Sequence, residues 1–195
     1  MSKINTIILG LIIINTLFIS SCAGKLKEAN NIAESAGFKS TVLNTSYFKL
    51  QAFYRISRTR VPITIYIEGD GLGWLTPTQP SSNPTPRNPL ALRLAAIDKG
   101  ENVVYIARPC QYIELKHEKL CHVPYWTHKR FAKEVILAVD EAIDTMVSKA
   151  KAKNIHLVGY SGGGAVVRVG VVAGSGVAAG ECGAGGDYWV GLAAR

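Results

Sequence analysis

The sequence predicts an α/β protein in which a mainly parallel sheet carries helices on both of its faces. Apolar, β-branched runs alternate along the chain with segments whose apolar residues recur every three or four positions. Two parallel strands with a helix between them require a crossover connection, so this alternation favours right-handed β-α-β units. A glycine-rich turn at residues 159–163 (GYSGG) follows the last predicted strand.

Four segments have the composition of strands. In the first, residues 47–56 (YFKLQAFYRI), apolar and polar side chains alternate, and this period of two predicts a half-buried strand at one edge of the sheet. Residues 61–67 (VPITIYI) are more uniformly apolar, which is typical of a strand inside a parallel sheet. The other two predicted strands are residues 102–107 (NVVYIA) and 155–158 (IHLV).

Two helices are expected between these strands. Asn88 and Pro89 provide a cap and a first-turn proline for a helix that ends at Gly100. Thr127 is a candidate cap for a longer helix, which has one apolar face and ends near Asn154. Each helix would serve as a crossover between two strands of the sheet.

The first residues have the features of a lipoprotein leader. Lys3 precedes a short apolar run, and the run ends in residues 19–22 (ISSC). These features define a secretory signal, and the run is shorter than the ~20 apolar residues of a membrane span. The ending resembles a bacterial lipobox, which implies cleavage before Cys22 and lipidation of that cysteine. The alternatives are an ordinary signal peptide cut near Ala23 and an uncleaved anchor.

We therefore expect four parts: a signal peptide, a tether, an α/β portion and an atypical tail rich in Gly, Ala and Val, over residues 1–21, 22–40, 41–168 and 169–195. The tether is expected because residues 25–39 are polar and show little periodicity. The expected location is the bacterial cell envelope. There the acyl group on Cys22 would hold the protein at a membrane, facing the periplasm or the exterior.

Composition argues against disorder and against nucleic-acid binding. The chain is 48 % hydrophobic and 18 % charged, which is typical of a folded domain. The formal net charge is +8, but the basic residues are spread along the chain. The densest cluster, Lys149, Lys151 and Lys153, closes a predicted helix, where cations interact favourably with the helix dipole. The expected partner is therefore membrane lipid, through the anchor, and not nucleic acid.

Two cysteines in one predicted loop are expected to form a disulfide. Cys110 and Cys121 are eleven positions apart, and the leader places them in an oxidising compartment. His117 and His122 lie close by in the sequence, which leaves a metal site as the alternative. The cysteines lack C-x-x-C spacing and no second ligand pair follows, so the disulfide is favoured and no metal is expected.

The glycine-rich turn has the pattern G-x-S-x-G, with Ser161 at its centre. Such glycines permit a sharp turn from a strand into a helix, which raises the serine oxygen above the edge of the sheet. A serine nucleophile needs a base, and the oxyanion that forms on attack needs preset donors. The Gly162 amide is one candidate donor. The second is the amide of Asp70 or, as second choice, of Gly71, in the glycine-rich loop after an earlier strand. The alternative is a simple glycine-rich turn, and the P-loop pattern is absent.

Five segments together carry a resemblance to a known family: YIEGDGLGW, PTPRNPLALRLA, VVYIARPCQY, WTHKRFAKEV and LVGYSGGGAV. With these motifs the chain resembles the α/β-hydrolase superfamily, specifically its bacterial lipoprotein members, over roughly residues 45–166. The resemblance implies an α/β-hydrolase fold, with Ser161 as the nucleophile and the Gly162 amide as an oxyanion donor. It implies no substrate, and no cofactor is expected.

After the serine, the sequence departs from the superfamily, in which an acid and then a histidine follow. All four histidines precede the serine, and each is expected at the surface: His117, His122, His128 and His156. The only later carboxylates are Glu181 and Asp187. Composition changes near Ala165, as though the superfamily pattern were truncated or altered there, and the strands that should extend the sheet past the serine strand have no convincing sequence.

These observations predict a membrane-anchored serine hydrolase-like lipoprotein that cleaves an ester or another small acyl compound through Ser161. Because no histidine follows the serine, we expect the enzyme to be inactive or impaired. The alternative is a non-catalytic lipoprotein of the cell envelope that uses the fold as a binding module. Labelling of the serine by an acylating or phosphonylating probe would distinguish the two.

Overall fold

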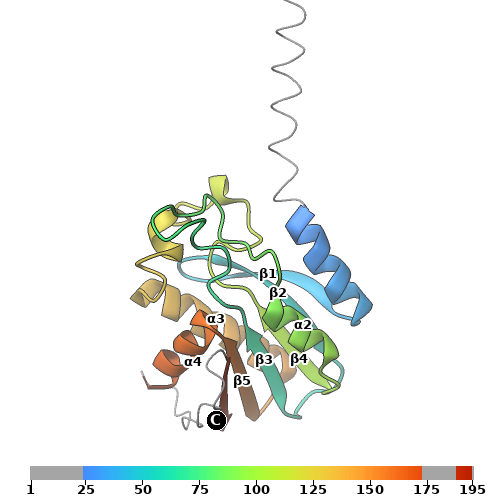
Figure 1. Ribbon diagram of the computed structural model, residues 1–195. Coiled ribbons are helices and arrows are strands. Elements are labelled where there is room, and N and C mark those ends of the chain that lie inside the picture. The colour runs from blue at the N-terminus through green and yellow to red at the C-terminus, as the bar shows by residue number, and fades with distance from the viewer. Residues whose placement is uncertain (1–23, 173–187, 195) are drawn as a thin grey trace, which may run out of the picture.

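A computed structural model of the protein describes residues 24–172 and 188–194, which form a six-stranded sheet flanked by helices (Figure 1). The strands occur in the order β1-β2-β4-β3-β5-β6 across the sheet. Their bounds are Lys39–Asn44, Lys49–Ile56, Ile63–Ile67, Asn102–Ile106, Asn154–Tyr160 and Tyr188–Ala194, for β1 to β6 in turn. The helices are α2 (Leu90–Ile97), α3 (Lys133–Ala150) and α4 (Gly162–Val172), and short 3₁₀ turns occur at Leu115–His117 and Val123–Trp126.

The prediction of a mainly parallel sheet with the α/β-hydrolase fold is wrong, because the sheet is mixed. Parallel pairing joins β3 to β4 and β3 to β5. The other three pairings, β1 with β2, β2 with β4 and β5 with β6, are antiparallel. One physical reason is the short connection over residues 45–48, since so tight a turn can only join antiparallel strands. The parallel part of the sheet is therefore confined to its three central strands.

The edge of the sheet also differs from the prediction. β2, which contains most of the predicted edge strand, lies between β1 and β4, and Leu50 and Phe53 are fully buried there. The edge is formed by β1, whose side chains are mostly exposed. Its sequence, KSTVLN, has few apolar residues and gave no strand signal, because an edge strand with one solvated face needs little apolar surface.

Residues 24–35, expected to belong to a tether, are instead helical. Ala29 and Ala33 are buried and belong to the same apolar cluster as Phe53 and Tyr105 of the sheet. Alanines four positions apart lie on one face of a helix, and their small size allows close packing. The polar composition of the segment concealed this narrow apolar face.

Two apolar clusters lie on opposite faces of the sheet. Residues 24–35 and α2 cover one face, with Leu92 and Tyr105 among its buried side chains. α3 and α4 cover the other, larger cluster, which includes Ile65 of β3 and Val139 of α3. α3 begins at Lys133 rather than near the predicted cap, because the Thr127 hydroxyl donates to the carbonyl oxygen of Val123, 2.8 Å away, within the preceding turn.

The serine strand β5 has neighbours on both sides, contrary to the expectation that the tail would provide no strand. β6 pairs with β5 from Tyr188, opposite Tyr160, to Ala194, opposite Asn154. Aromatic and aliphatic residues in YWVGLAA favour an extended backbone, and they were overlooked because the glycine-rich sequence before them dominates the tail.

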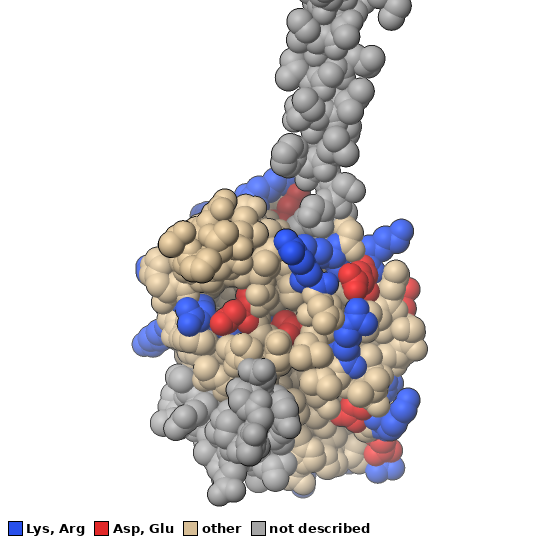
Figure 2. All heavy atoms as spheres, in the orientation of Figure 1, with Lys and Arg blue, Asp and Glu red and all other residues tan. Residues whose placement is uncertain are grey.

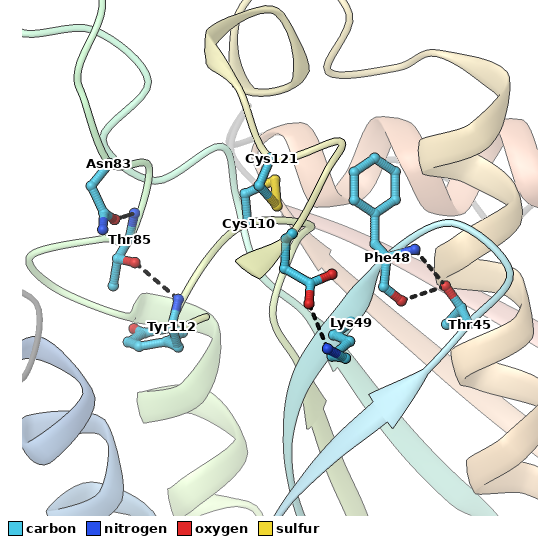
Figure 3. Close-up of a disulfide and its surroundings, with 9 residues drawn as sticks. Thr45, Phe48, Lys49, Asn83, Thr85, Cys110, Tyr112 and Cys121 are labelled. Carbon is cyan, nitrogen blue, oxygen red and sulfur yellow. Dashed lines mark hydrogen bonds and ion pairs between the residues drawn. A yellow bond between two sulfur atoms is a disulfide. The ribbon is translucent and has the colours of Figure 1, made fainter. Parts of the chain in front are cut away.

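The predicted disulfide between Cys110 and Cys121 is confirmed, with a Cα–Cα distance of 5.3 Å (Figure 3). It closes the loop that follows β4. An ion pair of 2.6 Å between Lys49 Nζ and Glu118 Oε1 ties the same loop to the start of β2. Among the described residues, no group of three or more His, Cys, Asp or Glu side chains could hold a metal ion.

The predicted signal peptide and Cys22 lie outside the described residues, as do Glu181 and Asp187. Within the described ranges, no helix has the length and apolar character needed to cross a membrane.

Candidate functional site

Ser161 occupies the junction between β5 and α4 with a backbone φ of +48°, a left-handed conformation that is uncommon for a residue with a side chain. The turn around it is tight. A Cβ atom on Gly159 would lie 2.5 Å from the Cα of Gly164, and one on Gly163 would lie 2.5 Å from the carbonyl oxygen of Glu68. Both glycines are therefore required sterically, which gives the G-x-S-x-G spacing a physical reason in this chain.

A pocket of about 290 Å³ lies beside Ser161. The loop after β3 and the turn after β5 meet there, because β3 and β5 are parallel neighbours whose carboxyl ends lie at the same edge of the sheet. The residues lining the pocket come from these two segments and from the start of α2: Glu68, Asp70, Gly71, Leu72, Pro86, Arg87, Asn88, Tyr160 and Ser161. Figure 2 shows acidic side chains between basic ones on one face of the molecule.

Of the three predicted oxyanion donors, Asp70 and Gly71 line this pocket, whereas Gly162 adjoins it in the chain, directly after Ser161. Asp70 and Gly71 line it together with Ser161, and within the described residues their backbone N–H groups make no hydrogen bond. Gly162 is the first residue of α4, so its N–H has no acceptor inside the helix. The Ser161 hydroxyl likewise forms no hydrogen bond with any described residue. The pocket is thus lined by a serine hydroxyl and by two residues whose backbone N–H groups are unpaired within the described part of the chain.

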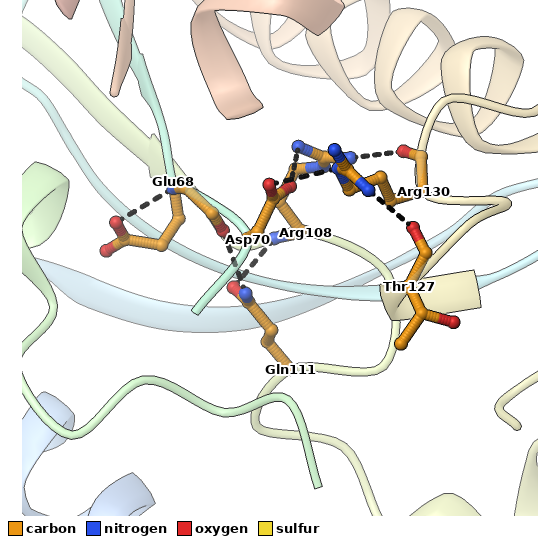
Figure 4. A network of polar contacts seen from close by, with 7 residues as sticks. Glu68, Asp70, Arg108, Gln111, Thr127 and Arg130 are labelled. Carbon is orange, nitrogen blue, oxygen red and sulfur yellow. Dashed lines mark hydrogen bonds and ion pairs between the residues drawn. The ribbon is translucent and has the colours of Figure 1, made fainter. Parts of the chain in front are cut away.

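The side chain of Asp70 lies between two arginines (Figure 4). The sequence predicted a role for the backbone amide of this residue but none for its carboxylate. Its Oδ1 is 3.3 Å from Nη1 of Arg108, and its Oδ2 is 3.3 Å from Nε of Arg130. The carboxylate also occupies the space where a Cβ on Gly162 would lie. A carboxylate this close to the nucleophile turn would oppose an oxyanion, and the two guanidinium groups compensate its charge.

Arg108 is buried, with 5 % of its side chain exposed. Burial lowers its pKa to about 10, while the neighbouring Asp70 carboxylate raises the pKa and Arg130 lowers it further. Arg108 therefore remains positively charged at neutral pH. Its Nη2 donates to the backbone oxygen of Arg130 at 2.5 Å, and its backbone N–H donates to Oε1 of Gln111 at 3.1 Å.

Gln111 links the loop after β4 to the loop after β3. Its Nε2 donates to the carbonyl oxygen of Gly69 at 2.9 Å. The disulfide loop after β4 is therefore hydrogen-bonded to the loop that carries Asp70 and Gly71. Sequence reasoning missed this network because its members are far apart in the chain. The available signal was a polar pair, Arg108 and Gln111, directly after a buried strand.

Glu68 is a buried carboxylate at the floor of the pocket, and only 1 % of its surface is exposed. Its Oε1 accepts from the Gly69 backbone N–H at 2.9 Å, and its Oε2 accepts from the Tyr105 hydroxyl at 3.2 Å. Burial raises the pKa of Glu68, while hydrogen bonds from the backbone of Gly69 and of Ala91, in the first turn of α2, oppose the rise. No side chain at the N-cap position of α2 forms a capping hydrogen bond. The Glu68 carboxylate instead accepts from the backbone of the first turn of α2 and acts as its cap.

The raised pKa of Glu68 predicts a pH dependence of stability. A carboxyl group that binds its proton more tightly when folded stabilises the protein fully below its unfolded pKa of about 4.5, and this contribution is lost as the pH rises through the folded value. Glu68→Gln cannot titrate. We therefore expect the free energy of unfolding of the wild type, measured relative to Glu68→Gln, to fall as the pH rises above about 4.5. Urea unfolding between pH 4 and pH 8 measures this, with exposed Glu34→Gln as the control. A difference that does not change with pH would contradict the prediction.

None of the four histidines lines the Ser161 pocket. His117 is exposed and lies 3.4 Å from Oε2 of Glu114, and His156 lies within β5, opposite Thr64. His122 packs edge-on against the ring of Tyr125, and His128 is an exposed residue of the segment before α3. Among the described residues that line the pocket, Glu68 and Asp70 are therefore the carboxylates that could accept a proton from Ser161.

Comparisons of the chain with protein-family models, with curated proteins and with solved structures found no match.

Proposed function

We propose that this protein is a serine hydrolase-like lipoprotein, held at a membrane by its N-terminus, whose Ser161 attacks the carbonyl carbon of an ester or another small acyl compound. The observation that carries the proposal is the position of Ser161, a serine with positive φ at a strand-to-helix turn. It lies beside a pocket lined by Asp70 and Gly71, whose backbone N–H groups form no hydrogen bond with any described residue.

The proposed chemistry is acyl transfer in two steps. Attack by Ser161 Oγ forms a tetrahedral intermediate, whose oxyanion is held by the Gly162 amide and by the amide of Asp70 or Gly71. The alcohol then leaves with a proton, and water hydrolyses the acyl-serine. Since no histidine lines the pocket, the proton of Ser161 has a poor acceptor, and the proposal is therefore of an impaired catalyst.

A fluorophosphonate probe tests the nucleophile. Labelling needs one reaction per molecule, so it detects a serine whose turnover is slow. We expect the wild type to be labelled on Ser161, Ser161→Ala to remain unlabelled, and Ser148→Ala, which changes an exposed serine of α3, to label as the wild type does. Peptide mass mapping identifies the modified residue. Folded wild-type protein that stays unlabelled after long incubation would contradict the proposal.

The second candidate function is a non-catalytic binding module. The absence of a histidine from the lining of the Ser161 pocket favours it. A module of this kind would bind a small ligand in the pocket and leave Ser161 unmodified by the probe, so the same experiment decides between the two.

The proposed location is the bacterial cell envelope, with a lipid-modified Cys22 as the anchor. We expect Cys22→Ser to abolish incorporation of labelled palmitate and to move the protein from the membrane fraction to the soluble fraction. The shift should be large, because one acyl chain gives only marginal binding whereas several anchor a protein stably. Immunoblotting of the two fractions measures it. Continued palmitate labelling of the variant would refute the lipobox interpretation.

A further inference from the structure

A second cavity, of about 330 Å³, lies next to the Ser161 pocket. Asp70 and Gly71 line both cavities, so the loop that offers unpaired backbone N–H groups separates them. The remaining residues lining the second cavity are Gly73, Trp74, Trp126 and Arg130. A carbonyl group placed at Asp70 and Gly71 would have one cavity on each side. The two cavities therefore suit the two parts of an ester, the acyl group and the alcohol.

The cluster beside the second cavity carries an excess positive charge. Within the described ranges, Asp70 is the one carboxylate paired with Arg108 and Arg130, which share it. Arg108 is buried, whereas 39 % of the Arg130 side chain is exposed. Nε of Arg130 faces Asp70, and its Nη1 donates to the carbonyl oxygen of Thr127 at 2.9 Å. Its Nη2 has no hydrogen-bond or ion-pair partner among the described residues. The Arg130 guanidinium group is thus positioned by the ion pair to Asp70, by the Nη1 hydrogen bond and by the ring of Phe131, whose centroid is 4.9 Å from its central carbon. Its Nη2 is left to bind an anion.

Two tryptophans also line the second cavity. Trp74 is 46 % exposed, while Trp126 is buried and donates from its indole Nε1 to the carbonyl oxygen of Ser81 at 2.9 Å. A Cβ on Gly73 would lie 2.8 Å from the backbone oxygen of Trp126, so the loop that carries Trp74 lies directly against it. The two indoles provide an apolar surface close to a guanidinium group with a free nitrogen.

We propose that the second cavity is a substrate subsite that takes a short apolar chain ending in an anionic group, a carboxylate or a phosphate. The apolar chain packs on Trp74 and the anion accepts from Nη2 of Arg130. A guanidinium group already positioned by other bonds loses little freedom when it binds such a group. The proposal deepens the proposed function, since it defines the substrate class as esters that carry a negative charge on one side of the carbonyl.

Binding to a protein that cannot turn over tests the subsite separately from catalysis. In the Ser161→Ala background, tryptophan fluorescence is titrated with sodium hexanoate, hexyl phosphate and 1-hexanol, which share an alkyl chain and differ in the head group. We expect one or both anions to bind at least about tenfold more tightly than the alcohol, and Arg130→Gln to remove this preference. Lys129→Gln, which removes one exposed positive charge at the adjacent position, is the matched control and should keep it. The stronger of the two anions identifies the head group.

Two outcomes would overturn the subsite. One is equal binding of the anions and the alcohol, and the other is an anion preference that survives in Arg130→Gln. Arg130→Lys, which keeps the charge but not the geometry of the guanidinium group, should retain part of the preference and shows whether loss in Arg130→Gln reflects charge rather than misfolding. The proposed function fails independently, through absence of fluorophosphonate labelling at Ser161, so the two failures are distinguishable.

Discussion

Protein comprising residues 22–195 is expected to hydrolyse a p-nitrophenyl ester at a rate only about 10³- to 10⁴-fold above the uncatalysed reaction, far below that of an intact serine hydrolase. In the proposed reaction, the pocket beside Ser161 would bind the ester, and the amides of Asp70 and Gly71, unpaired among the described residues, would stabilise the oxyanion. What the pocket lacks is an imidazole to accept the serine proton. Asp70 is a poor substitute because its carboxylate is paired with two arginines. Glu68 is a poor substitute because its carboxylate already accepts hydrogen bonds from Gly69 and Tyr105.

Adding imidazole to the assay tests the cause of this low rate. The pocket beside Ser161 has a volume of about 290 Å³, which is sufficient for a small heterocycle beside an ester. A base in the correct position contributes ~10²–10⁴-fold, so we expect the rate of the wild type to rise with imidazole concentration and to saturate. Ser161→Ala should show only the rise that imidazole causes in buffer. Turnover at ordinary enzyme rates without imidazole would contradict the prediction, and would require His117, His122 or His128 to act as the base.

Removing the disulfide is expected to lower the free energy of unfolding by about 3 kcal/mol. Cys110 and Cys121 close a loop with a sequence separation of 11 residues, and Cys110 is fully buried. The bridge limits the freedom of the unfolded chain. In the folded chain it constrains the loop that contains Gln111, which is hydrogen-bonded to Gly69 beside the pocket.

Urea unfolding of the Cys110→Ala/Cys121→Ala double variant measures the effect of the disulfide. Reduced wild-type protein is the matched control, because it retains both sulfur atoms and separates loss of the bridge from loss of buried volume. We expect both samples to unfold at lower urea concentration than the oxidised wild type. Identical midpoints for oxidised and reduced wild type would show that the bridge adds nothing to stability.

Local features of this chain could be predicted from its sequence, whereas the arrangement of its sheet could not. The serine turn and the disulfide depend on residues that are close together in the chain. Their spacing in the sequence is therefore sufficient to predict their geometry. The direction of a strand depends on its neighbours. The apolar character of β2 is the same whether it lies at an edge or between β1 and β4, so periodicity alone misplaced it.

The polar network at the site was not predictable for a related reason. Asp70, Arg108 and Arg130 are separated by tens of residues, and they meet because the loops after β3 and β4 and the segment before α3 converge at one edge of the sheet. The glycine pattern predicted only that the backbone amide of Asp70 lies near Ser161. It carried no information about the carboxylate, whose position depends on the two arginines.

The antiparallel pairing of β6 with β5 places Ala194 far from the site. Tyr188 lies opposite Tyr160, next to Ser161, while Ala194 lies opposite Asn154 at the other end of the strand. With about 3.4 Å per residue, the last residues of β6 are about 20 Å from the serine turn. A probe attached near Ala194 would therefore lie at the end of the strands opposite the pocket. Immobilisation through a group attached there should leave both cavities open to ligands.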